Sequence, residues 1–367
     1  MSHNNDYQDY LNALEKRISV SEQEPAEVKK VCSPKKRRGR YKVVRLRPVY
    51  LLCFLAASVI LTVTVSVAAK PKAEPKPQNN TVSGEKYAPA PVKETEEPPL
   101  AFAFAENTAE IPASNDAAGA VVINYDKSEV IAARNPHERY YPASTTKVMT
   151  LLVAVENIKR YSDTFKFSYE IIDPLYLQQA TLAGFESGEE VNMTDLLYGT
   201  ILPSGADAAV GLAISVSGTE AAFVELMNKK VEELGLENTH FANVTGLHDP
   251  NNYTSPYDMA VILGTAMKNP ICKKVLSTYQ YTASPTEQHP EGLKMEATLF
   301  KNMYGTEPET ATIMGGKTGF VNESGYCIAS YGHNNTTKTD YIVVTMKNST
   351  RWPAFHGQID LYKEFAK

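Results

Sequence analysis

The chain has 367 residues, a formal net charge of −5, and 43% hydrophobic residues. This composition supports a globular core, and the acidic balance argues against a nucleic acid partner. Its four cysteines and seven histidines show neither the C-x-x-C nor the H-E-x-x-H spacing of metal sites, so we expect no metal and no cofactor.

The N-terminal part of the chain predicts a membrane anchor. Residues 1–48 hold 12 Lys and Arg against 6 Asp and Glu, whereas the 21 residues of 49–69 include no charged residue. About 20 apolar residues suffice to cross a bilayer as a helix, and a positive flank stays in the cytoplasm. We expect a cytoplasmic basic tail over 1–48 and a single transmembrane signal-anchor over 49–69, which place the remainder outside the cell membrane. Cleavage after Ala69, which would give a secreted protein, is the alternative.

A proline-rich linker is predicted over 70–111. Seven of the 22 prolines lie between residues 70 and 100, among Lys, Glu, Asn and Ser. Such a composition favours extended, solvated chain over a packed core. Subtracting the +6 of the basic tail from the total of −5 leaves −11 for the rest of the chain, and we assign 112–367 to one folded domain.

Within that domain the hydrophobic pattern changes from strands to helices and back. Residues 119–125 and 129–134 are apolar runs joined by a short polar turn, which predicts a β-hairpin. Residues 145–156 are apolar nearly all round, as expected of a buried helix. Helices are then predicted over 194–201, 207–216, 220–234 and 255–266, strands over 314–321, 325–331 and 340–346, and a last helix over 353–365.

Strands at both ends of the domain, around a helical centre, predict an α+β fold. The expected architecture is an antiparallel sheet built from both ends of the domain, covered by helices, with a helical subdomain.

The first chemical motif is Ser144-x-x-Lys147, at the start of the predicted buried helix. Positions i and i+3 share one helix face, so the Lys147 amine reaches the Ser144 hydroxyl and can act as its base. A free lysine has a pKa of about 10.4, so burial and a second cation, for which Lys317 is the candidate, must lower the pKa. The alternative, a capping serine and a solvated lysine, fits poorly with the apolar neighbours.

Two further motifs follow in order, at spacings of 60 and 113 residues. Ser204 lies on a break between helices, where its hydroxyl can relay a proton to a leaving amine or simply cap a helix. Lys317-Thr318-Gly319 lies on a predicted strand, where alternation puts Lys317 and Gly319 on one face. Lys317 and the Thr318 hydroxyl can donate to a carboxylate, and Gly319 lets substrate approach the backbone; an exposed strand edge is the alternative. The ordered set indicates a serine acyl-transfer site.

From about residue 118 the chain resembles the serine D-alanyl-D-alanine carboxypeptidases, which are low-molecular-weight penicillin-binding proteins of peptidase family S11. The resemblance covers about two thirds of the chain and includes the residues around the three motifs. Many relatives also carry a C-terminal β-rich domain and a C-terminal amphipathic anchor, neither of which we expect in this chain; we expect the N-terminal span to replace that anchor. The segments that carry the resemblance are 141–144, 246–254, 257–260, 317–320 and 324–326.

The resemblance implies a fold like that of β-lactamases and penicillin-binding transpeptidases, and a two-step reaction. Ser144 would attack the D-Ala-D-Ala bond of the peptidoglycan stem pentapeptide, and water would hydrolyse the acyl-enzyme; β-lactam antibiotics would acylate the same serine. The backbone N–H groups of Ser144 and Phe320 would form the oxyanion hole, and Thr318 with Lys317 would bind the terminal carboxylate. Arg351 is a further candidate for that carboxylate, although an ordinary surface arginine is the stronger interpretation.

One departure keeps other functions open. The second motif of the family usually ends in Asn, whose amide binds the substrate backbone, whereas this chain has Ala206. A D,D-transpeptidase of the same fold, or a catalytically weak protein that binds wall peptide, are therefore alternatives. A β-lactamase is disfavoured because it needs E-x-x-L-N, and the nearest match, residues 233–237, ends in Glu.

Overall fold

The computed structural model describes residues 98–303 and 308–367. The tail, the transmembrane segment and most of the linker predicted for residues 1–97 lie outside this range, so those predictions stay untested. Among the described residues no single helix is long and apolar enough to cross a membrane. One sharply bent helix pair, Ala206–Ser217 with Glu220–Glu233, passes the same test by length and composition alone.

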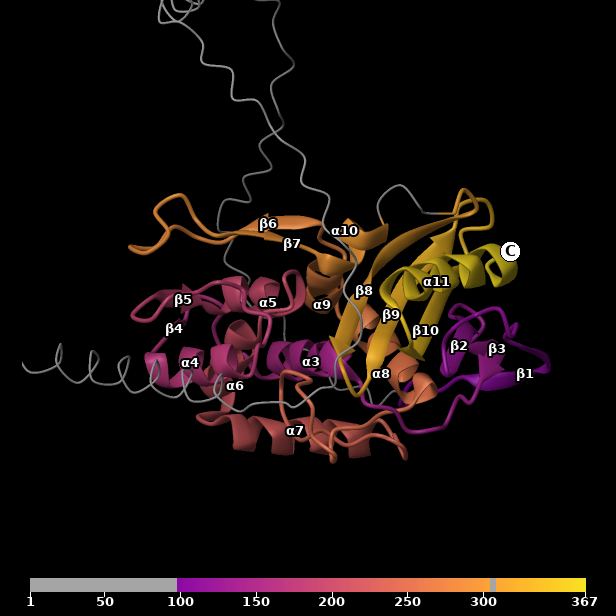
Figure 1. Cartoon of the computed structure of the whole chain (residues 1–367), viewed down its shortest axis with the longest axis horizontal. Coiled ribbons are helices and arrows are strands. Elements are labelled where there is room, and N and C mark those ends of the chain that lie inside the picture. The colour runs from indigo at the N-terminus through magenta and orange to yellow at the C-terminus, as the bar shows by residue number, and fades with distance from the viewer. Residues whose placement is uncertain (1–97, 304–307) are drawn as a thin grey trace, which may run out of the picture. The chain divides into compact units, whose positions relative to one another are not determined.

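A six-stranded sheet forms one side of the described domain (Figure 1). Its strand order is β1-β3-β2-β10-β9-β8, and every neighbouring pair is antiparallel except β1 and β3. The predicted sheet, assembled from both ends of the domain, is thereby confirmed. The strands are β1 (Ala103–Glu110), β2 (Gly119–Asn124), β3 (Glu129–Arg134), β8 (Ala311–Val321), β9 (Gly325–Asn334) and β10 (Asp340–Asn348).

The first strand corrects the predicted linker, which was expected to run to residue 111. Strand β1 pairs in parallel with β3, so residues 103–110 belong to the sheet. Just before it, Phe102 is buried, and its backbone N–H and C=O both bond to the Tyr257 hydroxyl at 3.0 Å. The folded domain therefore begins before β1.

The predicted helices are present, with ends shifted by a few residues. Sequence reasoning missed three helices, α4, α9 and α10, and two short hairpins, β4–β5 and β6–β7. The helices are α3 (Lys147–Asn157), α4 (Tyr169–Leu177), α5 (Met193–Ile201), α6 (Ala206–Ser217), α7 (Glu220–Glu233), α8 (Pro256–Lys268), α9 (Pro270–Leu276), α10 (Thr298–Met303) and α11 (Arg351–Phe365), and the hairpin strands are β4 (Thr164–Lys166), β5 (Glu190–Asn192), β6 (Gln280–Thr282) and β7 (Lys294–Glu296).

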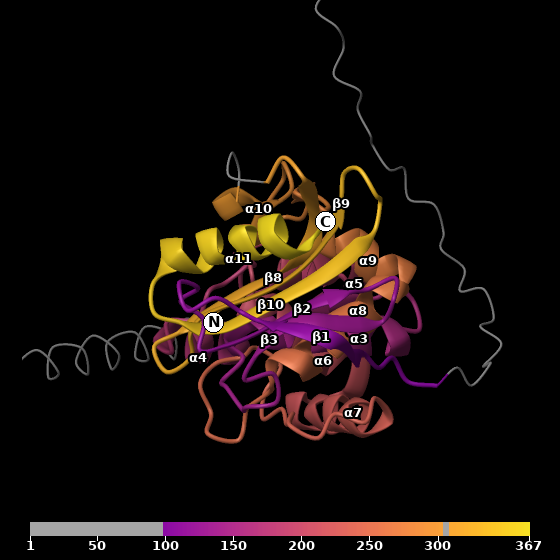
Figure 2. The same cartoon turned by 90° about the vertical axis from the view of Figure 1, so that its right-hand side faces the viewer.

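Both faces of the sheet are covered, as Figure 2 shows with α11 on one side and α8 and α3 on the other. Because side chains alternate along a strand, the central strand β2 supplies both cores. Val121 and Ile123 join the larger core with α3 and α8, whereas Ala120 and Val122 join the smaller core under α11. All six residues of β2 are accordingly buried.

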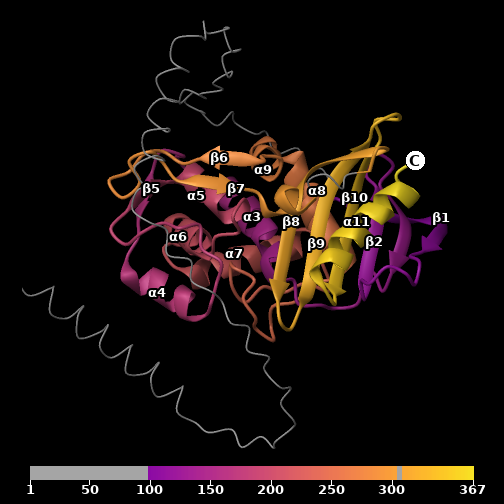
Figure 3. The same cartoon turned by 45° about the horizontal axis from the view of Figure 1, so that its top comes forward.

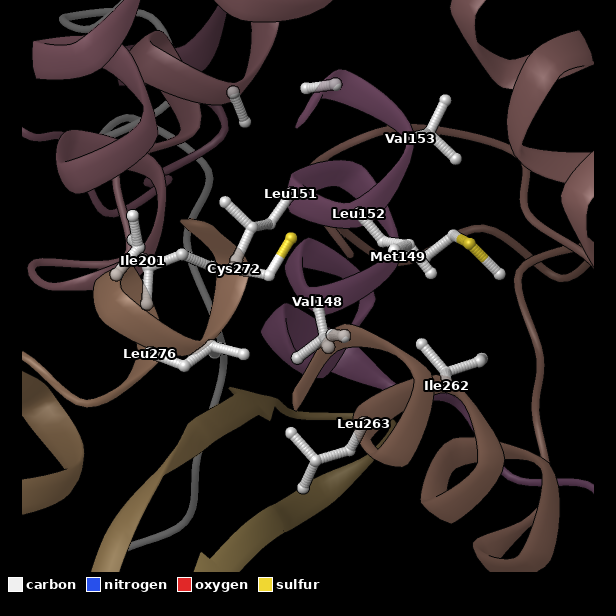
Figure 4. Packing of buried hydrophobic residues seen from close by; sticks show 14 of the residues in the cluster. Val148, Met149, Leu151, Leu152, Val153, Ile201, Ile262, Leu263, Cys272 and Leu276 are labelled. Carbon is white, nitrogen blue, oxygen red and sulfur yellow. The ribbon is translucent and has the colours of Figure 1, made fainter. Parts of the chain in front are cut away.

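Helix α3 lies at the centre of the larger core. Nine consecutive residues from Lys147 to Val155 are buried, which confirms the prediction of an all-round apolar helix. Val148, Leu151 and Leu152 point into a cluster with α8 and α9 (Figure 4). The packing on every side fixes α3, and with it the segment that precedes it, between the sheet and the helical layer.

Candidate active site

Ser144 lies in a 3-10 turn, Ala143–Thr146, directly before α3. The sequence predicted that this serine stands at the helix end, and the structure adds one tighter turn. Ala143 has a φ of +47°, in a backbone region that residues with a side chain rarely adopt. Such conformations occur often at functional sites. The residue before the serine is therefore held in a strained conformation by its surroundings.

Two glycines allow this strained turn to pack. A Cβ on Gly246 would lie 1.9 Å from the Ala143 carbonyl oxygen, and a Cβ on Gly319 would lie 2.7 Å from the Ser144 nitrogen. Neither distance is possible for a real side chain, so only glycine fits at these positions. Gly319 was predicted to let substrate approach the backbone; in the structure the Ser144 backbone occupies the space beside Gly319.

Lys147 is placed to act on the serine. Its Nζ lies 3.1 Å from Ser144 Oγ and donates to the Thr245 carbonyl at 2.6 Å, while the side chain is 2% exposed. Burial lowers the pKa of Lys147 to about 7, against an opposing effect of the Asp207 carboxylate. About half of the amine is therefore neutral near pH 7, with a lone pair that can accept the serine proton.

Lys317, the expected second cation, interacts electrostatically with Lys147. Burial is the main cause of the low Lys147 pKa, and the repulsion between the two lysine charges disfavours protonation of both amines together. Burial and the Lys147 charge together lower the pKa of Lys317 well below its ordinary value. Lys317 Nζ donates to the Thr318 carbonyl at 2.8 Å.

A turn that sequence reasoning missed orients the Lys147 amine. Asn243 Oδ1 accepts hydrogen bonds from the N–H groups of Thr245 at 3.2 Å and Gly246 at 2.7 Å. Thr150 Oγ1, on α3, donates to the Val244 carbonyl at 2.8 Å. These bonds fix the Thr245 carbonyl that accepts a hydrogen bond from the Lys147 amine. The 246–254 segment was noticed as family-like, but no role was assigned to the residues before it.

Asp207 is the second missed residue, and it lies in the first turn of α6. Its carboxylate is fully buried and accepts N–H bonds from Ala183 at 2.7 Å, Gly184 at 3.1 Å and Phe185 at 3.3 Å. Burial raises its pKa, although the three N–H groups act in the opposite direction. The sequence signal that could have revealed Asp207 is an acidic residue in an otherwise apolar helix. Asp207 joins α6 to the segment that follows α4.

Strand β8 carries the third motif at the free edge of the sheet. Lys317 and Gly319 are buried and Thr318 is half-buried, in agreement with the predicted alternation. The Thr318 hydroxyl shares a hydrogen bond of 3.0 Å with the Thr298 hydroxyl of α10. Phe320 follows, and 47% of its surface is exposed.

A pocket of about 400 Å³ opens in front of the serine. Strand β8 and its turn form one wall, and the loop after α4 with the start of α6 forms another. The lining residues include Ser144, Lys147, Gln178, Gln179, Ala206 and Phe320.

Five of the predicted site residues lie outside this lining: Ser204, Lys317, Thr318, Gly319 and Arg351. Ser204 is buried, has a φ of +69°, and is not among the described residues that line the pocket. Arg351 is exposed at the start of α11 and donates to Asn302 Oδ1, which favours the interpretation as a surface arginine. Thr318 and Lys317 precede Phe320, which does line the pocket, by two and three residues along β8.

A second cavity, of about 460 Å³, lies at the end of β1 and includes Arg134. Both terminal nitrogens of its guanidinium donate hydrogen bonds to backbone carbonyls, so Arg134 joins the segment before β2 to the sheet. Those carbonyls belong to Ile111, Pro112, Asn115 and Ala117. Within the described part of the chain no three His, Cys, Asp or Glu side chains gather as metal ligands.

A buried lysine in contact with a serine, at the start of a buried helix and beside the edge of an antiparallel sheet, defines a serine–lysine acyl-transfer class of α+β protein. Within this class, the family profile Peptidase S11, D-alanyl-D-alanine carboxypeptidase, matches residues 105–350. The chain belongs to this family, and the resemblance found from its motifs is confirmed.

Individual relatives agree with the family assignment. The chain is 32% identical over 232 residues to D-alanyl-D-alanine carboxypeptidase DacF of Bacillus subtilis, covering 63% of this chain and 58% of that protein. It is 31% identical over 247 residues to the D-alanyl-D-alanine carboxypeptidase of Streptomyces sp. K15, covering 65% and 82%. The chain thus spans little more than half the length of some curated relatives that it matches.

Solved structures agree with the fold. The Streptomyces K15 DD-transpeptidase superimposes with a TM-score of 0.60 at 26% identity, covering 68% of this chain and 97% of that one. Penicillin-binding protein 5 from Haemophilus influenzae gives a TM-score of 0.60 at 29% identity, covering 69% and 70%. The predicted α+β fold of the penicillin-binding transpeptidase type is confirmed.

Proposed function

We propose that the chain is a serine-type D-alanyl-D-alanine carboxypeptidase that removes the terminal D-Ala from peptidoglycan stem pentapeptides. The observation that carries the proposal is the 3.1 Å contact between Lys147 Nζ and Ser144 Oγ, made by a lysine whose pKa burial lowers to about 7. The family assignment and the names of the relatives support the same reaction.

Acylation begins when Ser144 Oγ attacks the carbonyl carbon of the penultimate D-Ala and Lys147 takes the hydroxyl proton. The backbone N–H groups of Ser144 and Phe320 stabilise the oxyanion, and losing one such donor typically costs about 10² to 10³ in rate. The C–N bond then breaks, and the terminal D-Ala leaves with the proton that returns to its nitrogen from Lys147. Water hydrolyses the Ser144 ester and regenerates the serine.

The terminal carboxylate of the substrate binds near Lys317 and Thr318 in this proposal. Lys317 is buried and Thr318 is half-buried, and both precede the pocket residue Phe320 on β8. Substrate lies along the free edge of β8, where an added strand finds unpaired backbone groups. β-Lactams acylate Ser144 by the same steps.

The protein acts at the outer face of the cell membrane in this proposal. The uncharged stretch over 49–69, after the basic run of 1–48, supports a single-pass anchor with a cytoplasmic N-terminus. Fractionation of cells that express the full-length chain tests it. Recovery in the membrane fraction, with the folded domain accessible to external protease, is expected; recovery in the medium contradicts an uncleaved anchor.

D-Ala release tests the proposed activity. Full-length chain is incubated with a peptide that ends in D-Ala-D-Ala, and free D-Ala is measured for wild type, Ser144→Ala and the exposed control Ser162→Ala. Wild type and the control are expected to release D-Ala, and Ser144→Ala to release none. Failure of wild type to release D-Ala, or release by Ser144→Ala, contradicts the proposal.

A D,D-transpeptidase is the second candidate, because a solved DD-transpeptidase is structurally similar to the chain. Ala206 in the pocket wall also leaves the balance between water and amine acceptors undetermined. Product analysis with an added amino-acid acceptor separates the two functions. A carboxypeptidase gives shortened peptide, whereas a transpeptidase gives peptide joined to the acceptor. Binding of the peptide without either product indicates a catalytically weak wall-peptide binder.

A further inference from the structure

The wall of the pocket that faces β8 is formed by the loop after α4 and by the first residue of α6. Helix α4 lies beside α6 (Figure 3). Four hydrogen bonds join the loop to α6: the Ala206 N–H donates to the Thr181 carbonyl at 2.8 Å, and the Asp207 carboxylate accepts from the N–H groups of Ala183, Gly184 and Phe185. The loop is therefore a fixed part of the site.

Helix α4 ends in a Schellman motif whose left-handed residue is Gln179. The Ala180 N–H donates to the Leu175 carbonyl and the Gln179 N–H to the Tyr176 carbonyl, both at 2.9 Å. This is the paired bonding pattern of the motif, and Gln179 has a φ of +55°.

Glycine is the usual residue at that position, because a Cβ is strained there. The same chain follows this rule at the end of α7, where Gly235 has a φ of +67° and the same bonding pattern recurs. Gln179 breaks the rule at the helix end that lines the pocket. Residues that depart from local preference without a local gain are expected at functional sites.

A peptide that pairs with the edge of β8 forms backbone hydrogen bonds along only one of its own two edges. The backbone N–H and C=O groups of its other edge face the opposite wall, where they lose water and need partners. A carboxamide both donates and accepts, so it can bind such a backbone group of either kind. On this wall Ala206 has no polar side-chain atom, whereas Gln179 is an exposed residue with a carboxamide, and the helix end fixes its backbone conformation.

We propose that the Gln179 carboxamide binds the backbone of the peptide substrate on the wall opposite β8. This assignment rests on the proposed function, since it requires an extended peptide ending in D-Ala-D-Ala beside Ser144. The neighbouring Gln178 also lines the pocket, but it has an ordinary helix-end conformation with a φ of −80°.

The test compares Gln179→Gly, Gln179→Asn and the matched control Gln178→Ala in the full-length chain. Glycine removes the carboxamide and relieves the backbone strain, so it separates binding from structure. The kcat/KM for D-Ala release is expected to fall about tenfold in Gln179→Gly, as for the loss of one hydrogen bond to substrate. The Tm of this variant should equal or exceed that of wild type. Gln179→Asn, which keeps an amide and tolerates the left-handed region, should lose less than Gln179→Gly.

A role for Gln179 in the helix end alone predicts the opposite, because glycine is the better residue there. Activity of Gln179→Gly within twofold of wild type overturns the inference while leaving the proposed function intact. A loss in Gln178→Ala as large as that in Gln179→Gly also overturns the assignment. No release of D-Ala by wild type contradicts the proposed function itself, so the two failures are distinguishable.

Discussion

Replacing Lys147 by methionine is expected to stabilise the folded chain near neutral pH while it abolishes acylation. The pKa of Lys147 falls from 10.5 to about 7 on burial, and each unit is worth about 1.4 kcal/mol. At pH 7 the unfolded lysine is charged, so holding it in the core costs about 4 kcal/mol. Methionine removes that cost but leaves the Thr245 carbonyl without its donor, a loss of about 1 to 3 kcal/mol.

The net gain at pH 7 is about 1 to 3 kcal/mol, which raises Tm by roughly 2 to 6 °C for a domain of this size. The stability gain of the methionine variant decreases as pH rises. Since the folded pKa is lowered, the destabilisation by Lys147 is fully present below pH 7 and disappears as pH rises through 10.5. At pH 10 the cost is about 1 kcal/mol, and the methionine variant should lose its advantage.

Thermal unfolding of the full-length chain at pH 7 and pH 10 checks this prediction. Lys268→Met, at an exposed lysine on α8, is the matched control and should change stability by no more than about 0.5 kcal/mol at either pH. A Lys147→Met variant that is less stable than wild type by the same amount at both pH values would refute the argument that burial makes this lysine a base.

Three further predictions test the geometry around the serine. Asp207→Asn removes the negative charge that opposes the lowering of the Lys147 pKa, so the rising limb of kcat/KM against pH should move to lower pH; a shift to higher pH contradicts it. Gly319→Ala puts a Cβ 2.7 Å from the Ser144 nitrogen, so the rate of penicillin acylation should fall at least about 10²-fold, and an unchanged rate is the adverse result. A fragment that begins at Ile111 lacks β1 and the buried aromatic ring before it, and should be less stable than one that begins at residue 98 by roughly 2 kcal/mol or more in denaturant unfolding. Equal midpoints for the two fragments would show that β1 contributes nothing.

The elements that the sequence predicts are those with a strong hydrophobic period. The hairpin over 119–134 and the buried helix α3 follow from apolar runs whose faces are covered on both sides in the structure. Strand β1 was missed because its residues are mostly exposed or half-buried at a sheet edge. Helix α4 was missed because it contains Pro174 and buries only Leu175.

The candidate site divides in a similar way. Ser144 and Lys147 are predictable because both functional groups are side chains at a helical spacing. The Lys147 amine donates to the main-chain carbonyl of Thr245. Every residue has such a carbonyl, so the residue type does not reveal this partner. The structural requirement for glycine at position 319 could not be predicted either, because it depends on a 3-10 turn that is distant in sequence and packs against β8. Long-range backbone contacts of this kind need the fold before they can be recognised.

The central claim is that Ser144 is a nucleophile whose base is the Lys147 amine. The most direct measurement is the intact mass of the full-length chain after incubation with benzylpenicillin across a range of pH, with the modified peptide mapped by fragmentation. The account predicts one covalent adduct on Ser144, formed faster as pH rises through about 7, and none in Ser144→Ala. An adduct on another residue, or no adduct on wild type at any pH, would contradict it.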